Sequence, residues 1–562
     1  MRQLRLKNTY TGQIETFEPL DPAKKEVSIY SCGPTVYSYA HIGNFRSFLF
    51  ADVLRRTLTR RGYAVRQVMN ITDVGHMTQD HVADASGEDK LSRAARELGT
   101  DPYTVAKFFE DAFVEDAKTL GLSIYQGEEA TNPDLHPRAT HHVPEMLAMI
   151  QTLLDRGFAY VVPSGEVYFE VAKFADYGKL SGKVLDDLEA GARVAVREEK
   201  KDPRDFALWK VDDKHLMLWD PHGPEGWPPG DYERYQKLLP GGIDARVKRG
   251  FPGWHIECSA MSKAHLATTI DIHTGGEDNI FPHHECEIAQ SQGAHGVPLA
   301  RYWVHGRHLL VNNRKMSKSE GTFFTVRDLL DPAGSKRPEL AKDLQAIGFE
   351  GGRATAQALR FALVSTPYTQ PMNFGMDVLG QARASVERLQ SSMTRLRELA
   401  GDATGGEPNA SLVATVNEKL AAFDDALDDN LNTANAVAAW FELVTALNQR
   451  EKEMTPADAR FALDATLGLN AVLGVLDLRT RSGLVQIAAM DATLASGGAP
   501  SVDVASVGEG PLDGAATEAL ILARHAARKA KDFAKADAIR DLFKARGVLI
   551  EDVKGAVRWK LP

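Results

Sequence analysis

Four side chains with metal-binding chemistry stand out in this sequence. His283 and Glu287 are four positions apart, so a helix would place both on one face. The chain has three cysteines, and two of them, Cys32 and Cys258, lie within conspicuous motifs. Two thiolates, an imidazole and a carboxylate form a set that suits Zn²⁺. Because the two cysteines are far apart in the chain, their spacing alone does not establish a metal site.

Two other motifs carry groups suited to phosphate. The segment PTVYSYAHIGN (34–44) leads into a predicted helix, whose N-terminal N–H groups and dipole favour an anion. His41 and Asn44 can each donate to a phosphoryl oxygen, and Gly43 lets a nucleotide approach the backbone closely. The alternative interpretation of His41 is that it only caps the helix.

The second motif is RKMSKS (314–319), in which Lys315 and Lys318 are bracketed by small polar residues. Two lysines in such a loop can clamp a polyphosphate leaving group. Alone, a loop of this composition is usually a solvated turn. Its occurrence together with the 34–44 segment, at opposite ends of one predicted domain, favours nucleotide chemistry.

A β-α-β unit is predicted to position the first of these motifs. VSIYSC (27–32) and YAVRQVMNIT (63–72) are predicted strands, and the spacing of Phe45, Leu49 and Val53 predicts a helix between them. A parallel pair joined by a crossover helix implies a doubly wound sheet that binds its ligands at the carboxyl ends of the strands. The first cysteine of the metal set lies at such an end.

The rest of the chain extends this fold class. We expect an α/β, doubly wound (Rossmann-type) parallel-sheet catalytic domain with an insertion, then a helical bundle and a small C-terminal α+β domain. A hairpin is expected at 159–171, and bundle helices are expected near 353–365, 376–400, 411–426, 431–449 and 456–476. The predicted segments are 1–157 and 251–335 (the two halves of the catalytic domain), 158–250 (insertion or connective domain), 336–494 (helical bundle), 495–516 (linker) and 517–562 (C-terminal domain).

Composition limits the class of protein. At 562 residues and 43% hydrophobic content, the chain is long enough for several cores. Three cysteines exclude a disulfide scaffold and fit a reducing cytoplasm. The N-terminus has no apolar core of signal-peptide length, and no run reaches roughly 18 apolar residues, so we expect a soluble cytoplasmic protein that does not enter membranes. A net charge of −10 argues against non-specific coating of nucleic acid.

These motifs resemble those of the class I aminoacyl-tRNA synthetases, and specifically the cysteinyl-tRNA synthetase family. Softer similarity continues through the predicted bundle into the C-terminal tail, so the resemblance covers nearly the whole chain. The matching blocks are YSCGPTVYSYAHIGN (30–44), NITD (70–73), RGFPGWHIECSAM (249–261), DIHTGGEDNIFPHHECEIAQ (271–290) and RKMSKSEGTFFT (314–325).

The resemblance assigns roles to individual residues. It implies one Zn²⁺ on Cys32, Cys258, His283 and Glu287. It implies catalytic contacts from His41, Asn44, Lys315 and Lys318, and ATP contacts from His41, Gly43, Asn44, Gly275, Asp278 and Lys318, with Mg²⁺ accompanying ATP. It further implies an amino-acid pocket lined by Thr72, Trp254 and His273. Core packing is the alternative interpretation of Trp254 and His273, and a plain turn is the alternative for the GGED segment (275–278).

The implied activity is ATP-dependent activation of L-cysteine to cysteinyl-adenylate, followed by transfer to the 3′-terminal adenosine of tRNA(Cys), by a monomeric enzyme. The helical bundle would then bind the tRNA stem and anticodon. One alternative is a ligase that joins cysteine to a small amine, as in mycothiol biosynthesis. The segment 518–560 argues against it, because 11 Lys and Arg against 6 acids suit tRNA binding. A second alternative is a non-catalytic, synthetase-like tRNA-binding protein.

Some positions depart from the family pattern. Many relatives continue NITD with a second acidic pair and a lysine, and in NITDVGHMTQD (70–80) His76 and Asp80 replace that charge pattern. The stretch 211–248 is longer than expected and has no assigned role, and the 495–516 linker is expanded. His284 is either a group that supports the metal ligand or the ligand itself, although the i,i+4 spacing favours His283. Cys286 is expected to be structural.

Overall fold

The computed structural model describes residues 3–23, 25–79, 83–84, 86–183, 199–316, 322–335, 337–349, 351–401, 405–478, 482–496, 498, 507, 512, 514–553 and 555–561. The chain divides into two compact units. The first comprises Met1–Val386, Asn417–Glu442 and Gly468–Val475, and the second comprises Glu387–Val416, Leu443–Leu467 and Leu476–Pro562. Each unit is described by itself.

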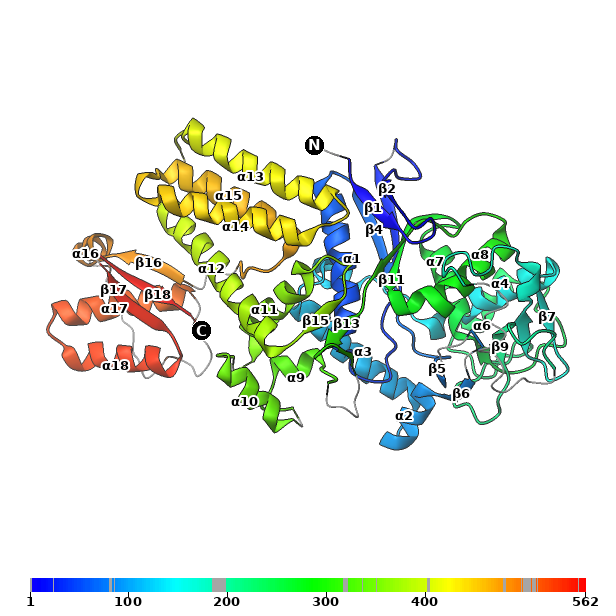
Figure 1. Cartoon of the computed structure of the whole chain (residues 1–562). Coiled ribbons are helices and arrows are strands. Elements are labelled where there is room, and N and C mark those ends of the chain that lie inside the picture. Colours follow the sequence, from blue (N-terminus) through cyan, green and yellow to red (C-terminus); the bar gives the residue numbers. More distant parts are fainter. Residues whose placement is uncertain are drawn as a thin grey trace. The chain divides into compact units, whose positions relative to one another are not determined.

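A four-stranded parallel sheet organises the first unit. Its order is β12-β11-β3-β4, with β12 at Ala300–Gly306, β11 at Ile270–Gly276, β3 at Glu26–Ser31 and β4 at Ala64–Met69. Helix α1 (Ile42–Arg60) joins β3 to β4, which confirms the predicted crossover. Helices α7 (Trp254–His265) and α8 (Glu285–His295) lie on the opposite side of the sheet from α1 (Figure 1). The doubly wound fold class is confirmed.

Apolar residues of the predicted pattern build the core under this sheet. Phe45, Leu49 and Val53 of α1 are buried, as their helical spacing predicts. The hairpin β1–β2 (Arg5–Asn8 and Gln13–Thr16) closes one side of the core. The cluster comprises Leu4, Leu6, Phe17, Val27, Ile29, Phe50, Leu54, Leu58, Ile272, Tyr302, Val304, Tyr368 and Leu431.

The insertion forms a second, antiparallel sheet in the order β10-β9-β8-β7. Strands β7 (Ala159–Val161) and β8 (Val167–Phe169) are the two arms of the predicted hairpin, and Tyr160 pairs with Tyr168. The remaining elements here are β9 (Phe206–Lys210), α6 (Asp231–Leu238) and β10 (Phe251–Pro252).

Shorter elements complete the first unit. They are β5 (Met77–Gln79), β6 (Ser86–Asp89), α2 (Lys90–Leu98), α3 (Pro102–Thr119), α4 (Val143–Asp155), β13 (Leu309–Val311), β14 (Arg314–Lys315), α9 (Val326–Leu330), α10 (Pro338–Ala346), α11 (Gly352–Ser365) and β15 (Met372–Phe374). Four longer helices, each divided between the two units, follow in the predicted order: α12 (Met376–Ala400), α13 (Ala410–Asp428), α14 (Thr433–Arg450) and α15 (Pro456–Leu473).

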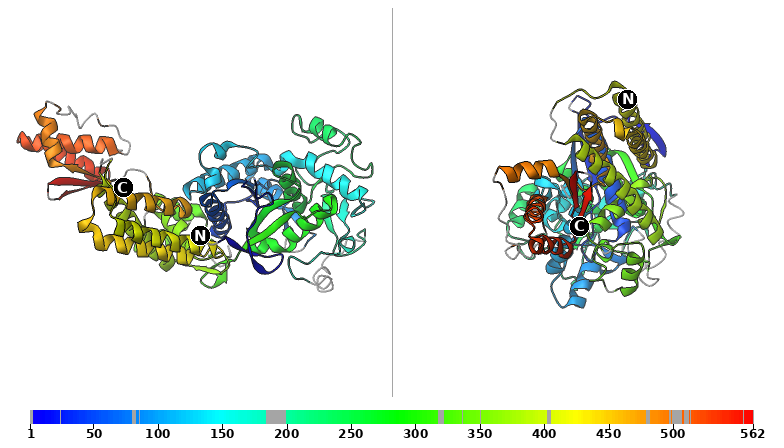
Figure 2. Two further views of the ribbon diagram at one scale, coloured as in Figure 1. Left: turned by 90° about the horizontal axis from the view of Figure 1, so that it is seen from above. Right: turned by 90° about the vertical axis from the view of Figure 1, so that its left-hand side faces the viewer.

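The second unit contains a small α+β fold with its own core. Strand β16 (Ser482–Gln486) pairs with β18 (Ala556–Lys560), which pairs with β17 (Leu549–Val553). Helices α17 (Gly514–Lys529) and α18 (Phe533–Ala545) lie side by side against this sheet (Figure 2), and α16 (Ile487–Ala495) follows β16. Met490, Leu520, Ile539, Phe543 and Trp559 are among its buried residues. Most of the predicted linker 495–516 lies outside the described residues.

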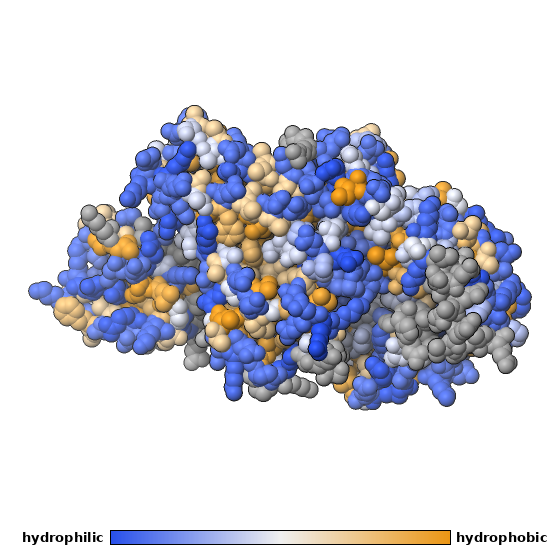
Figure 3. All heavy atoms as spheres, in the orientation of Figure 1, coloured by the Kyte–Doolittle hydropathy of each residue, from blue (hydrophilic) through white to orange (hydrophobic). Residues whose placement is uncertain are grey.

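Polar side chains dominate the face of the molecule drawn in Figure 3, with apolar residues in scattered patches between them. Among the described residues, no helix combines the length and the apolar character that a membrane span requires.

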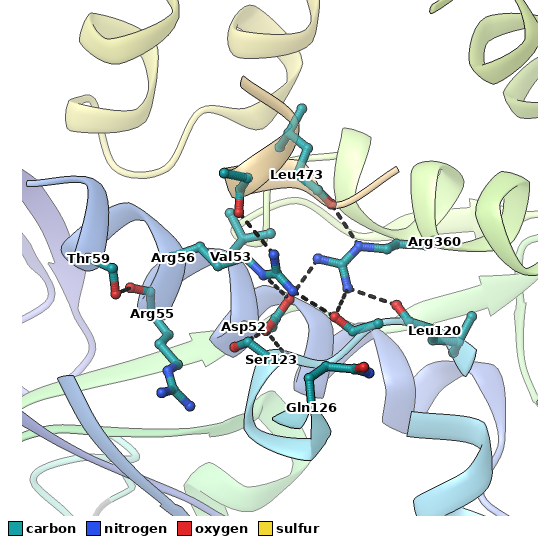
Figure 4. Close-up of polar contacts among 12 residues, drawn as sticks. Asp52, Val53, Arg55, Arg56, Thr59, Leu120, Ser123, Gln126, Arg360 and Leu473 are labelled. Atoms are coloured by element: carbon teal, nitrogen blue, oxygen red, sulfur yellow. Dashed lines mark hydrogen bonds and ion pairs between the residues drawn. The ribbon is translucent and has the colours of Figure 1, made fainter. Parts of the chain in front are cut away.

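A buried ion pair between Asp52 of α1 and Arg360 of α11 (Gly352–Ser365) holds α1 in place (Figure 4). Arg360 of α11 donates through Nη2 to Asp52 Oδ2 of α1 at 2.6 Å, and both side chains are at most 3% exposed. Arg56 donates to the same oxygen at 2.7 Å, and the Ser123 amide donates to Oδ1 at 2.7 Å. Arg360 also donates to the Leu473 carbonyl at 2.7 Å. Burial alone would raise the pKa of Asp52, but the guanidinium groups of Arg56 and Arg360 hold it well below its usual range.

Asp52→Asn should lower the free energy of unfolding by about 3–5 kcal/mol, because Arg360 would remain buried without its carboxylate. Since the pKa of Asp52 is lower in the folded chain, its contribution is complete at neutral pH and is lost as the pH falls below about 4, the unfolded value. Urea denaturation at pH 7 and pH 3 measures both effects. Asp111→Asn is the control, because Asp111 pairs with Lys107 in an exposed i,i+4 pair. Equal losses for the two variants would contradict this role of Asp52.

Candidate active site

A cavity of about 590 Å³ opens at the carboxyl ends of the parallel strands. Each strand delivers a lining segment directly after its last residues: Cys32 after β3, Asn70 and Thr72 after β4, Glu277 and Asp278 after β11, and His308 after β12. The N-terminus of α1, the start of α7 and the β14 segment complete the wall. The topology therefore gathers segments that are distant in sequence around one space.

The predicted metal ligands meet at one end of this cavity. Cys32 Sγ lies 3.9 Å from Cys258 Sγ and 3.7 Å from Glu287 Oε1. The i,i+4 spacing brings His283 Nε2 to 3.1 Å from the same Glu287 oxygen. The ligand atoms of all four residues lie within 4.8 Å of one another.

A second set of four meets the same distance condition, and it shares two members with the first. It consists of Cys32, His273, His284 and Glu287. His284 Nε2 lies 3.2 Å from Cys32 Sγ, and His273 Nε2 lies 2.9 Å from Glu287 Oε2. Distance alone therefore does not choose between His283 and His284.

The number of protons available for hydrogen bonds distinguishes His283 from His284. Ala83 O, His255, His283 and Glu287 form a row: His255 Nε2 is 3.0 Å from the carbonyl, the two Nδ1 atoms are 3.0 Å apart, and His283 Nε2 faces Glu287. Three contacts need three protons, but two neutral imidazoles carry only two. With Glu287 as a carboxylate, one contact in the row therefore brings two lone pairs together.

A cation resolves this conflict better than a third proton does. Burial lowers the pKa of His255 to about 4 and that of His283 well below its usual range, so both rings are neutral at pH 7. If His255 donates to Ala83 and His283 donates to His255, the lone pair of His283 Nε2 faces Glu287. His284 forms a second row: its Nδ1 contacts His305 Nε2, and His305 Nδ1 contacts the Thr9 hydroxyl. A hydroxyl can donate or accept, so this row can be satisfied without a cation. With Glu287 as a carboxylate, the His283 row is therefore the one of the two that a bound cation would complete.

The two thiols fit the same conclusion. Burial raises the pKa of Cys32 and of Cys258, and the neighbouring Glu287 raises both further. Two thiolates and a carboxylate this close cannot all ionise without a compensating charge. A bound cation reverses the shift and makes thiolates the stable form. The residues present therefore fit a soft divalent metal such as Zn²⁺.

The N-terminus of α1 forms the other end of the cavity. His41 is the N-cap: its Nδ1 accepts from the Asn44 amide at 3.1 Å, and Asn44 Oδ1 accepts from the His41 amide at 3.1 Å. Because Nδ1 accepts, the ring proton of neutral His41 resides on Nε2 and can be donated. A Cβ on Gly43 would lie 2.6 Å from Met316 Cε, so glycine permits this close approach.

The other residues expected at ATP lie partly along the same wall. Lys315 Nζ lies 3.4 Å from Asp278 Oδ1, and His308 Nδ1 lies 3.2 Å from the other oxygen of that carboxylate. Gly275 lies inside β11, where a Cβ would come within 2.6 Å of His284 Cε1. Lys318 lies outside the described residues.

Of the three residues expected around the amino acid, Thr72 and Trp254 line the cavity. His273 lies behind Glu287, stacked on Trp303 at 4.5 Å. Cys286 is buried against the Tyr177 hydroxyl at 3.4 Å, outside both sets of possible ligands.

Sequence reasoning missed the role of Asn70. Its side-chain oxygen accepts from the Gly33 amide at 3.0 Å, and its amide nitrogen donates to the Thr72 hydroxyl at 3.1 Å. Asn70 thus ties the segment after β3 to the segment after β4. Asn70 is the first residue of the NITD block, and this position is the sequence feature that could have indicated its role.

Comparison with known proteins agrees with this geometry. Residues 17–231 and 240–338 match the family described as the tRNA synthetases class I (C) catalytic domain. Residues 422–477 match the DALR domain, and 513–559 match the cysteinyl-tRNA ligase anticodon binding domain. The structure of agnB2 LeuRS from Agrobacterium radiobacter K84 shares the fold, with a TM-score of 0.51 at 14% identity over 82% of this chain and 85% of that one. Fold and site together define a class I aminoacyl-tRNA synthetase.

Full-length relatives narrow the class. A Cysteine–tRNA ligase of Salinibacter ruber is 40% identical, covering 99% of this chain and 98% of the relative. One from a Geobacillus species is 38% identical, covering 100% of both. The chain belongs to the cysteine–tRNA ligase family, as the sequence motifs indicate.

The cap geometry separates two roles of His41. His41→Ala should lower the free energy of unfolding by about 0.5–2 kcal/mol, because the first turn of α1 loses its cap. His41→Asn should stay close to wild type, since asparagine is a preferred N-cap that cannot supply an imidazole N–H. Urea denaturation of the two variants checks this. Equal stability of the Ala and Asn variants would contradict a capping contribution, whereas lost activity in His41→Asn would report on phosphate contact alone.

Proposed function

We propose that this chain activates L-cysteine with ATP to cysteinyl-adenylate and transfers the cysteinyl group to the 3′-terminal adenosine of tRNA(Cys). The observation that carries this proposal is one cavity with a cluster of two thiols, an imidazole and a carboxylate at one end and a helix N-terminus suited to an anion at the other. The carboxylate of a bound cysteine would lie between these ends, where it can attack the α-phosphate. Family membership supports the same reaction.

Selection of cysteine against serine is the demanding part of this task. The two substrates have nearly the same shape, and pockets without a specific partner separate close analogues by only about 10–200-fold. We assign Cys32, Cys258, His283 and Glu287 as the residues that hold Zn²⁺. When bound, Zn²⁺ supplies a ligand position that favours a thiolate over a hydroxyl. His255 orients His283, and His273 orients Glu287 from behind.

The groups at the α1 end of the cavity would act on ATP through their positions and their charges. His41 Nε2–H, the amide groups at the start of α1 and Lys315 would stabilise charge on the phosphates, with Mg²⁺ bound mainly through the nucleotide. We assign Lys318 to the same task from the family pattern. No nucleophile of the protein is required, because the substrate carboxylate attacks directly and pyrophosphate leaves.

The two alternatives explain less. A ligase for small amines has no use for residues 513–559, which match an anticodon binding domain. A non-catalytic tRNA-binding protein has no use for a metal-ligand set combined with a phosphate-binding helix end. The domain matches at 422–477 and 513–559 instead support tRNA as the acceptor.

Cysteine-dependent exchange of ATP with pyrophosphate tests the activation step and the ligand set together. The wild-type chain should carry about one zinc, and its exchange with cysteine should exceed that with serine by more than about a hundredfold. Cys258→Ser should lose zinc and exchange together, because a hydroxyl replaces thiolate poorly. Cys286→Ser, which alters a buried thiol away from the cluster, is the matched control and should keep both.

Each outcome has a distinct meaning. Full zinc content in Cys258→Ser would favour the set with His273 and His284, which lacks Cys258. Equal exchange with serine in the wild type would overturn cysteine selection itself.

Removal of the C-terminal fold tests the tRNA step. A chain ending at Leu478 loses β16 together with the rest of its sheet, so no strand is left unpaired. This chain should keep cysteine-dependent exchange, which needs only the cavity. Its kcat/KM for tRNA acylation should fall by at least about tenfold, because the basic residues of α17 and α18 are lost. Unchanged acylation by the shortened chain would exclude this fold from tRNA binding.

A further inference from the structure

His76 lies in the segment where the chain departs from the family pattern, and the structure gives this residue a place at the site. After His76 the chain leaves along the β5–β6 hairpin and returns at Lys90, the first residue of α2. The Lys90 amide donates to the His76 carbonyl at 2.9 Å, which closes the base of this excursion. The His76 side chain itself lines the cavity and is 8% exposed.

The rings of His76, Trp254 and His283 form a stack, and His283 is one of the four predicted metal ligands. The His76 and Trp254 rings are 4.2 Å apart and nearly parallel, with an angle of 12° between their planes. The indole also stacks on His283, at 4.3 Å and 24°, and it contacts the His255 ring at 5.1 Å and 37°. Trp254 therefore lies between a histidine of the cluster and His76. It is also one helical turn before Cys258 on α7, so both side chains face the same way.

Hydrogen bonds at both nitrogens fix the orientation of His76. Lys90 Nζ is 3.1 Å from Nε2, and an ammonium group only donates, so Nε2 accepts. The ring proton of the neutral imidazole is then on Nδ1, 2.8 Å from the Thr35 hydroxyl. Thr35 belongs to the loop after β3, and Lys90 begins α2. The ring is thus held from two separate elements in the one rotation that presents its flat face to the indole.

We propose that His76 is a positioning residue for cysteine recognition: it holds the Trp254 indole against His283 and so fixes the wall of the cavity beside the metal ligands. This inference rests on the proposed function, in which the amino acid binds at that end. The phosphate-binding groups, His41 and Lys315, belong to α1 and β14 and are not part of the stack. Loss of His76 should therefore weaken cysteine binding and leave ATP binding unchanged.

His76→Ala should raise the KM for cysteine in pyrophosphate exchange by about five- to tenfold, which corresponds to the loss of one aromatic stack. The KM for ATP, kcat and zinc content should stay within about twofold of wild type. His76→Phe keeps a flat ring against Trp254 and should recover most of the cysteine affinity. His76→Asn keeps polarity without a ring and should not.

His136→Ala is the matched control. His136 is also stacked on an aromatic ring, Tyr125, at 4.2 Å, but it lines a different cavity. Its removal should leave the KM for cysteine unchanged, even if both alanine variants lose similar thermal stability.

A double-variant cycle shows whether His76 acts through Trp254. If it does, His76→Ala should add little to the cysteine KM of Trp254→Ala, since no indole remains to be positioned. Additive effects, a parallel loss of ATP affinity or zinc, or equal behaviour of the Phe and Asn variants would overturn the inference. Wild-type protein without cysteine-dependent exchange would instead overturn the proposed function, so the two failures are distinguishable.

Discussion

The metal-ligand end of the cavity depends on lone pairs that two neutral imidazoles cannot satisfy when Glu287 is a carboxylate. Ala83 O, two neutral histidines and Glu287 make three contacts with two available protons, and two thiols lie against the same carboxylate. The fold nonetheless buries these groups together, at a cost that a bound cation would offset. Metal binding would therefore be linked to the folding of this region. In the function proposed above, selection of a thiol substrate would follow from the same arrangement, because the ligands that attract a soft cation leave it suited to sulfur.

The phosphate end depends on a different constraint, the placement of one helix. An N-terminus binds an anion only if its amide groups point at the ligand, so α1 must be held along its length. Its first turn is tied by the reciprocal cap of His41 and Asn44, and its middle by the buried pair of Asp52 and Arg360. Since Arg360 also donates to the carbonyl of Leu473, the last residue of α15, the end of this helix contributes to holding α1 in place.

Sequence reasoning was most successful where one residue type had a local consequence. The i,i+4 pair, the α1 crossover and the 159–171 hairpin follow from helical spacing, alternation and turn residues, and the structure contains all three. Sequence reasoning did not predict contacts between segments that are distant in the sequence. Nothing in local spacing shows that β16 pairs with β18 across the 495–516 stretch, or that His284 comes as close to Cys32 as it does. The choice between the two histidines needed the hydrogen-bond rows behind them.

The segment after NITD shows how a local departure becomes intelligible in three dimensions. In sequence, His76 replaces an expected acidic position, and the lysine of the pattern is missing. In space, the chain makes a hairpin and returns with Lys90, whose ammonium group then meets His76. Because the two ends of a hairpin are adjacent, residues that are separated in the sequence can meet at its base. His76 and Lys90 are 14 positions apart in the sequence, whereas the hairpin brings their side chains into contact beside the cavity that His76 lines.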